Sequence, residues 1–220
     1  QFKGKNVVLI DFWDYSCINC QRAQPYINAW YQKYKDQGLV VIGVHTPEFA
    51  FEHLQSNVQS AADKAGIKYP VVLDNEYATW NAFQNQYWPR EYLIDIDGYI
   101  VHDHAGEGEY DITEKAIQDA LSERAARLNA AAIVATSTVS VPAADLSGIQ
   151  SPETYFGSAR NQYLGNGMSG KSGVQTFTLP TSPQGNTLYL GGTWNIVGEY
   201  AEAGDNATVE YYYSSKNIYM

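Results

Sequence analysis

The chain has 220 residues, of which 45% are hydrophobic and 17% charged, and its formal net charge is −10. This composition supports a globular core, and the length fits one large domain or two smaller ones. The negative charge argues against nucleic acid or an anionic membrane surface as a partner, because both select basic surfaces. No apolar run reaches about 18 residues, the length that can cross a bilayer. The chain begins with Gln1, and we expect a fragment or a mature form.

The first half of the chain alternates strand and helix patterns. Apolar β-rich runs predict buried strands, and apolar residues at helical spacing predict the helices between them. The expected elements are a strand at 6–12, a helix from Cys17 to Gly38, a strand at 39–44, a helix at 48–65, an extended segment at 69–74, a short helix at 76–83, a hairpin at 91–104 around Asp97-Gly98, and a helix to Leu128 with a capping box of Asp111 and Glu114. This order implies an α/β fold, a mixed sheet with helices on both faces.

The pattern changes after Asn129. The following residues are small and nearly uncharged and end in Ser-Pro, which is typical of a linker. The last part is rich in Gly, Thr and Tyr, without helical spacing, and predicts short strands between turns. The expected organisation is a first domain at 1–129, a linker at 130–152 and an all-β domain, sandwich-like or jelly-roll-like, at 153–220.

Both cysteines, Cys17 and Cys20, lie in the short stretch DFWDYSCINCQRAQPY. A disulfide across so small a loop would stabilise the fold little, because the stabilisation grows with loop length. Two inert buried thiols are one alternative. A zinc site is another, and its further ligands would come from His45, His53, His102 and His104.

The context of the two cysteines favours redox chemistry. A predicted strand runs into the pair and a predicted helix starts at it. Cys17 then lies at a helix N-terminus, where unpaired N–H groups favour the thiolate. Cys20, one turn on, faces inward and can attack a mixed disulfide. We therefore predict a redox-active pair, Cys17-Cys20, and no other cofactor.

The stretch LIDFWDYSCINCQRAQP resembles the active-site segment of thioredoxins, and more closely that of the extracytoplasmic TlpA/ResA-like branch. The resemblance extends over 5–128 and implies a thioredoxin fold there. The matching positions beyond the cysteines are a carboxylate that the family buries at Asp11, the family's tryptophan at Trp13, a helix kink at Pro25 and a cis-proline loop at Trp88-Pro89.

The motifs WDYSCINC, VHTPEF, YATW, YWPREYLID and GEGEYD are together similar to the thioredoxin-like domain of DipZ-type proteins. Those proteins also have a DsbD/CcdA-like membrane domain and a β-sandwich resembling a carbohydrate-binding module, which SPETYFG and GGTWNIVGEYAEAG resemble. The resemblance implies an extracytoplasmic location, periplasmic or on the cell-wall side, with membrane tethering in the full-length protein. It also implies a DsbD/CcdA-like electron donor. The chain departs from the family by lacking the membrane part and by its short β-part.

The candidate catalytic residues are two thiols for disulfide exchange and two acids. Cys17 attacks a disulfide and Cys20 resolves the mixed disulfide. Asp11, in an apolar strand, is either a paired structural carboxylate or the acceptor of the Cys20 proton, because burial raises the pKa of a carboxyl towards that of a useful base. Glu48 matches a glutamate that ResA-like proteins keep near the thiols. The alternative for Glu48 is an exposed acid at a helix start.

The candidate substrate-binding residues surround the thiols. A cis bond before Pro89 would leave the backbone of Trp88 free to pair with a substrate strand. Trp13 and Tyr15 are expected to divide between the core and the rim of the site.

These residues predict a thiol–disulfide oxidoreductase that reduces disulfides of secreted proteins. Ile18 and Asn19 carry no charge that would stabilise the thiolate, which favours a potential nearer thioredoxin, about −270 mV, than DsbA, about −120 mV. One alternative is a glycan-binding module with a scaffold thioredoxin-like domain, for which outward-facing aromatics in the β-part are the only indication. A peroxidase-like redoxin is the other.

Overall fold

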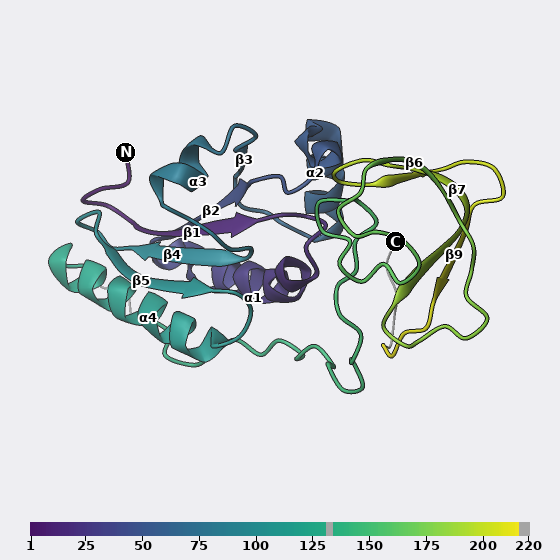
Figure 1. Ribbon diagram of the computed structural model, residues 1–220. Coiled ribbons are helices and arrows are strands. Elements are labelled where there is room, and N and C mark those ends of the chain that lie inside the picture. Colours follow the sequence, from purple (N-terminus) through teal and green to yellow (C-terminus); the bar gives the residue numbers. More distant parts are fainter. Residues whose placement is uncertain (131–133, 216–220) are drawn as a thin grey trace. The chain divides into compact units, whose positions relative to one another are not determined.

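The computed structural model describes residues 1–130 and 134–215. The chain forms two compact units, Gln1–Ala144 and Asp145–Met220 (Figure 1). Part of the expected linker belongs to the first unit, because Val134 is buried in its core and the backbone N–H of Val139 donates to Glu114. The first unit therefore extends beyond the expected boundary at Asn129.

A five-stranded mixed sheet in the order β3-β2-β1-β4-β5 forms the centre of the first unit. Its strands are β1 Val7–Trp13, β2 Leu39–His45, β3 Val71–Leu73, β4 Arg90–Ile94 and β5 Ile100–Ala105. β1 runs parallel to β2 and antiparallel to β4, and β4 and β5 form the expected hairpin. All residues of β1 are buried, because it lies inside the sheet with helices on both faces.

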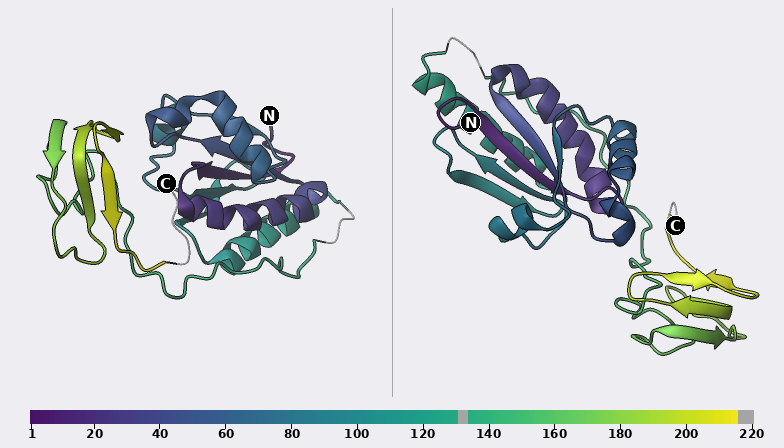
Figure 2. Two further views of the ribbon diagram at one scale, coloured as in Figure 1. Left: turned by 90° about the vertical axis from the view of Figure 1, so that its right-hand side faces the viewer. Right: turned by 90° about the horizontal axis from the view of Figure 1, so that it is seen from above.

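Helices cover both faces of this sheet, with α1 and α4 on the same face (Figure 2). The helices are α1 Ile18–Tyr34, η1 Lys35–Gln37, η2 Ala50–His53, α2 Gln55–Lys64, α3 Ala78–Ala82 and α4 Tyr110–Arg127. The larger core, around Trp30, Leu93 and Leu121, lies on the α1 side, and a smaller core lies around Phe12 and Trp80. No helix in the described part of the chain is long and apolar enough to cross a bilayer.

The predicted capping box at the start of α4 is wrong. The N-cap residue of α4 is Glu109, in the left-handed region with a φ of 47°, and its side chain caps nothing. Glu114, expected to cap the helix beside Asp111, is 1% exposed and accepts hydrogen bonds from α1 and from the segment after α4. Glu114 therefore makes tertiary hydrogen bonds in place of the helix cap that the local spacing predicted.

The second unit is all-β, as expected. Its strands are β6 Gly173–Phe177, β7 Leu188–Ile196, β8 Ala201–Ala203 and β9 Thr208–Tyr211. The first part of β7 pairs with β9, and its second part pairs with β6 and β8. The change falls at Gly191 and Gly192, where Gly192 has a φ of 74° and a Cβ would meet the backbone of Asn206 at 2.1 Å. Leu188, Leu190, Trp194 and Ile196 of β7 form much of the core of this unit.

Replacing Glu114 with Gln should lower the free energy of unfolding by about 1–3 kcal/mol, because the amide loses charge-assisted bonds in a buried place. The donors are the Tyr34 hydroxyl at 2.6 Å, Lys33 Nζ at 3.0 Å and the Val139 N–H at 2.8 Å. Urea unfolding measures the change. The control Glu123→Gln, at an exposed position of the same helix, should stay within about 0.5 kcal/mol. Equal losses in the two variants would contradict the assigned role.

Candidate active site

The two thiols lie where β1 leads into α1. Cys17 is the N-cap residue of α1, and its Sγ accepts a hydrogen bond from the backbone N–H of Cys20 at 3.4 Å. Cys20 is 3% exposed, whereas Cys17 is half-buried, and both are free thiols. One sulfur is therefore open to a substrate while the other is covered.

The surroundings move the pKa values of the two thiols in opposite directions. The hydrogen bond with Cys20 lowers the pKa of Cys17, helped by the N–H groups of Cys20 and Asn19 and opposed by partial burial. Burial holds the pKa of Cys20 well above its usual range, and the neighbouring sulfur of Cys17 adds to this effect. Cys17 is therefore the better nucleophile, and Cys20 keeps its proton until a base removes it.

The loop before β4 lies beside the exposed sulfur. The Trp88-Pro89 peptide bond is cis, as predicted. The Cys17 thiol lies 3.9 Å from the carbonyl oxygen of Trp88, to which it can donate. The Trp88 indole donates to the carbonyl of Thr46 at 3.0 Å, and its ring lies 4.2 Å from that of Trp80. These contacts fix a backbone carbonyl at the reactive sulfur; substrate binding by Trp88 and Pro89 stays a prediction.

The carboxyl of Asp11 is completely buried in β1. Its Oδ2 accepts a hydrogen bond from the Tyr69 hydroxyl at 3.4 Å, and the Gln24 amide donates to that hydroxyl. Burial raises the pKa of Asp11 to about 7, although the bond from Tyr69 lowers it in part. Asp11 can therefore exchange a proton near neutral pH, as a base for Cys20 must.

Gly43 of β2 makes room for the groups around Asp11, its partner in the parallel register. A Cβ at this position would lie 2.9 Å from Trp13 Nε1 and 3.1 Å from Tyr69 Cε2. The missing side chain thus lets both rings approach the strand, and the Tyr69 hydroxyl reaches the carboxyl.

A second buried carboxyl lies opposite Asp11, and the sequence reasoning missed it. Glu91 of β4 is the antiparallel register partner of Asp11 and is 2% exposed. Burial, and then the charge of Asp11, hold its pKa well above the usual range. A signal was present in the strand REYLI, where alternation places Glu91 on the same face as Leu93. An acid on the core face of a buried strand is unusual enough to mark a site.

A third buried carboxyl holds the loop that carries Cys17. Glu52 accepts hydrogen bonds from the backbone N–H groups of Glu48 and Phe49, both at 2.7 Å, and from the hydroxyl of Ser16. Burial, and then the charge of Asp14, raise its pKa to about 7. Glu48, the acid chosen from the sequence, is half-buried at the start of this segment. Its role near the thiols stays a prediction.

The aromatic residues before the thiols occupy different places. Trp13 is 3% exposed and belongs to the core. Tyr15 is half-buried, and its ring stacks on that of His45 with centroids 5.5 Å apart. His45 Nε2 lies 3.4 Å from Asp14 Oδ1, and both side chains are fully buried. Tyr15 therefore covers a buried polar pair beside the Cys17 loop.

Three of the four histidines considered as zinc ligands contact other groups. Besides His45, the ring of His102 lies 3.1 Å from the Thr113 hydroxyl, and His104 Nδ1 lies 3.5 Å from Glu109 Oε2. Within residues 1–130 and 134–215, no three His, Cys, Asp or Glu side chains form a group that could hold a metal ion.

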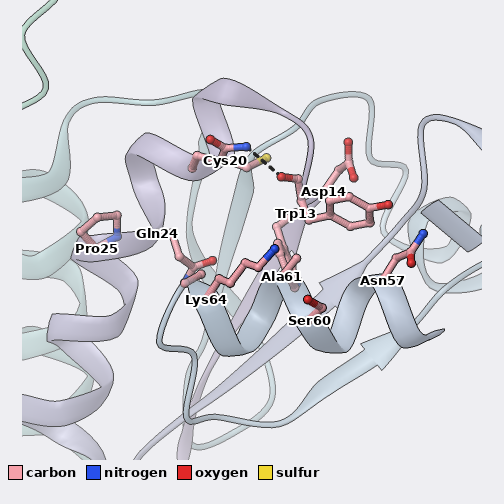
Figure 3. A pocket seen from close by; sticks show the side chains of 12 residues that line it. Trp13, Asp14, Cys20, Gln24, Pro25, Asn57, Ser60, Ala61 and Lys64 are labelled. Atoms are coloured by element: carbon pink, nitrogen blue, oxygen red, sulfur yellow. Dashed lines mark hydrogen bonds between the residues drawn. The ribbon is translucent and has the colours of Figure 1, made fainter. Parts of the chain in front are cut away.

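A cavity of about 600 Å³ opens beside the covered sulfur, between α1 and α2 (Figure 3). Its lining includes Trp13, Cys20 and Gln24 on one side and Asn57, Ser60, Ala61 and Lys64 of α2 on the other. Gln24 connects this cavity through the Tyr69 hydroxyl to the Asp11 carboxyl. Polar groups therefore extend from the cavity to the acid beneath the thiols.

In the reduced protein, iodoacetamide should label Cys17 at least about 10-fold faster than Cys20 near neutral pH, because the thiolate fraction follows the pKa and Cys20 is covered. Mass spectrometry of the digested protein measures both rates. In denaturant the two thiols should react alike. Slow and equal labelling of both thiols in the folded protein would refute the asymmetry.

Comparison with known proteins identifies both units. The Redoxin family model matches residues 1–121, and a model described as a thioredoxin-like C-terminal domain matches residues 151–220. The chain is 44% identical over 99% of its length to protein DipZ of Mycobacterium bovis, and it spans 31% of the length of DipZ.

Two further likenesses concern the first unit. The chain is 33% identical to the thiol-disulfide oxidoreductase YkuV of Bacillus subtilis, over 56% of this chain and 82% of YkuV. The solution structure of a thioredoxin-like protein in the oxidised form is 32% identical, with a TM-score of 0.52 over 56% of this chain and 82% of that one. The chain therefore belongs to the Redoxin family, and its first unit has a thioredoxin-like fold.

Proposed function

We propose that this protein reduces disulfides of secreted protein clients outside the cytoplasm. The observation that carries the proposal is that two neighbouring thiols differ in exposure and in the direction of their pKa shifts. Cys17 is half-buried with a lowered pKa, whereas Cys20 is covered with a raised pKa. An attacking thiol and a resolving thiol need these properties, and Asp11 supplies a buried group that titrates near neutral pH.

In each turn the thiolate of Cys17 attacks one sulfur of a client disulfide. The bond between Cys17 and the client forms as the client's own S–S bond breaks, and the released client sulfur takes up a proton. Asp11 then accepts the proton of Cys20, whose thiolate attacks Cys17 Sγ. The Cys17-Cys20 disulfide forms, and the second client sulfur leaves and takes up a proton. The client gains the two electrons that the cysteine pair loses.

The reducing direction is favoured by the lack of a charged residue between the two cysteines. Hydrogen bonds from Cys20 and backbone N–H groups lower its pKa, and the residues between the cysteines, Ile18 and Asn19, add no positive charge. A strongly oxidising pair needs a much more stable thiolate, as in DsbA. A potential near that of thioredoxin, about −270 mV, fits the site better.

Each turn leaves the pair oxidised, so the protein needs an electron donor. We place this role in a DsbD/CcdA-like membrane partner, and the support is the resemblance to DipZ-type proteins together with the 44% identity to DipZ. The same resemblance supports an extracytoplasmic location with membrane tethering in the full-length protein.

Glycan binding by the second unit is a second proposal, favoured by exposed tyrosines. Tyr200, Tyr212 and Tyr213 are 52%, 55% and 46% exposed, and the rings of Tyr211 and Tyr213 stack at an interplanar angle of 12°. Flat aromatic faces of this kind stack on sugar rings, whereas Trp194 is buried in the core. Calorimetric titration with polysaccharides tests the proposal, and a failure to bind would leave this unit structural.

The protein should catalyse reduction of insulin disulfides by dithiothreitol, and Cys20→Ser should accumulate disulfide-linked clients on Cys17, because the resolving sulfur is gone. Non-reducing gels and mass spectrometry of the trapped species measure the result. Cys17→Ser should trap none. Peroxide consumption without insulin reduction would favour the peroxidase-like alternative.

Asp11→Asn should slow resolution of a mixed disulfide on Cys17 by about 10²- to 10⁴-fold, because the base for Cys20 is lost. In the wild type the rate should rise as the pH increases through about 7, where Asp11 ionises. Release of the client thiol measures this step. The control Asp36→Asn alters an exposed acid of η1. A wild-type pH profile in Asp11→Asn would make Asp11 structural.

The same acid should affect stability in a pH-dependent way. Folding raises the pKa of Asp11 from 3.8 to about 7, so the stability present below the unfolded value is lost as the pH rises through the folded value. Above about pH 7, Asp11→Asn should therefore gain stability relative to the wild type, by up to about 4 kcal/mol, because one unit of pKa corresponds to about 1.4 kcal/mol. Urea unfolding at acidic and alkaline pH measures the gain, and a difference independent of pH would contradict it.

A further inference from the structure

Three ionisable side chains form a row across the sheet beneath the thiols. Asp11 of β1 is directly opposite Glu91 of β4, and Glu91 is directly opposite His104 of β5. Residues opposed in this way point to the same face of a sheet, with Cβ atoms about 5 Å apart. The row lies on the face that α1 and α4 cover, because Leu93, two residues from Glu91, packs in that core.

Each member of the row has a buried polar atom without a hydrogen-bond partner among the described residues. These atoms are Asp11 Oδ1, Glu91 Oε2 and His104 Nε2. Buried polar atoms are nearly always hydrogen-bonded, because an unmade bond costs free energy. Three such atoms lie on three neighbouring strands in one register, so the fold leaves incomplete hydrogen bonds at adjacent ionisable groups.

One end of the row acts on the Cys20 thiol, and the other end lies near the protein surface. At the inner end, the charge of Asp11 acts on the Cys20 thiol and contributes to its raised pKa, after burial and the contacts with Cys17. At the outer end, His104 Nδ1 lies 3.5 Å from Glu109 Oε2, and the side chain of Glu109 is 65% exposed. A histidine can take a proton on one ring nitrogen and release it from the other, which suits it to this position.

We propose that Glu91 and His104 relay the proton that Asp11 takes from Cys20 to the surface at Glu109. The proposal rests on the assigned role of Asp11 as the base of the resolving step. It adds two residues to the machinery of that step, neither of which touches the client or the sulfurs. They act through Asp11.

The charges around Glu91 fit a relay. Burial and the charge of Asp11 favour the protonated form of Glu91, and Glu91 lies opposite Asp11, whose Oδ1 has no partner among the described residues. The other titratable groups that face the pair are Tyr69, before β3, and Tyr110, at the start of α4, and burial raises the pKa of both hydroxyls. Both tyrosines stay neutral, and the mobile proton belongs to the two carboxyls together.

The proton movement balances. When Cys20 gives its proton to Asp11, Asp11 passes it to Glu91, and Glu91 releases its original proton to Nε2 of His104. His104 then releases the proton on Nδ1 towards Glu109 and water. One proton is delivered outside, Asp11 is again a carboxylate and Glu91 again protonated, and His104 is left with its proton on Nε2. Rotation of the ring, or proton exchange with water, resets His104, and the Cys20 thiolate is free to attack Cys17 Sγ. No electrons move along the row.

The test follows resolution of a defined mixed disulfide. Cys17 is first linked to thionitrobenzoate, and release of the coloured thiol by Cys20 is followed by stopped flow between about pH 6 and 8. The variants are Glu91→Gln, which keeps the size and the donor but cannot pass a proton, and His104→Ala with and without added imidazole. The matched control is His102→Ala, on the same strand but bonded to Thr113. Iodoacetamide labelling of the free Cys17 thiol checks that each variant keeps its active-site structure.

We expect Glu91→Gln and His104→Ala to release the thiol about 10-fold more slowly or worse, since general acid–base assistance is lost. Imidazole should restore the rate of His104→Ala, which a structural role would not explain. His102→Ala should match the wild type.

Wild-type rates in both row variants, no acceleration by imidazole, or an equal loss in His102→Ala would overturn the relay. The proposed function fails in a different way. If unaltered protein never releases the thiol, the resolving role of Cys20 is wrong, and the relay falls with it. If Asp11→Asn is slow while both row variants are fast, the function stands and only the relay is lost.

Discussion

The proposed mechanism depends on the carboxyl of Asp11, which is kept inside the central strand of a buried sheet. A carboxylate removed from water is costly unless it is fully hydrogen-bonded. Here the Tyr69 hydroxyl serves one oxygen, and the other has no partner in the described part of the chain. The resulting pKa of about 7 suits the role that the proposed mechanism gives to Asp11, and the same burial is costly to the fold once the carboxyl ionises. Stability and activity therefore oppose each other at this residue.

The asymmetry of the thiols follows from where one helix begins. Because α1 starts directly after Cys17, that sulfur meets unpaired N–H groups at the helix end, and Cys20, one turn on, meets the core. The covering of Cys20 would stop the reaction if its proton could not leave. The proposed mechanism therefore needs a base near Cys20, and it assigns this role to Asp11, on the strand that leads into the helix.

Sequence reasoning succeeded where neighbouring residues decide the structure. The order of strands and helices in the first unit follows from local patterns, and the cis bond before Pro89 was implied by the resemblance to thioredoxins. Glu91 was missed because its place opposite Asp11 depends on the register between strands far apart in the chain. Glu114 was misassigned because its spacing fits a helix cap equally well, while Tyr34 offers a stronger buried partner. Composition likewise could not show that residues after Asn129 would pack on the first unit.

The buried acids of this protein differ in how completely they are bonded. Both oxygens of Glu52 have donors, two backbone N–H groups and a serine hydroxyl, and Glu114 accepts from a tyrosine, a lysine and the backbone. These two hold loops and segments in place. Among the described residues, Asp11 and Glu91 each keep an oxygen without a partner, and the two lie opposite each other in the row. Burial alone therefore does not mark a working acid, since all four are buried. Incomplete hydrogen bonding, together with a place near the thiols, is what separates Asp11 and Glu91 from the acids that hold loops and segments.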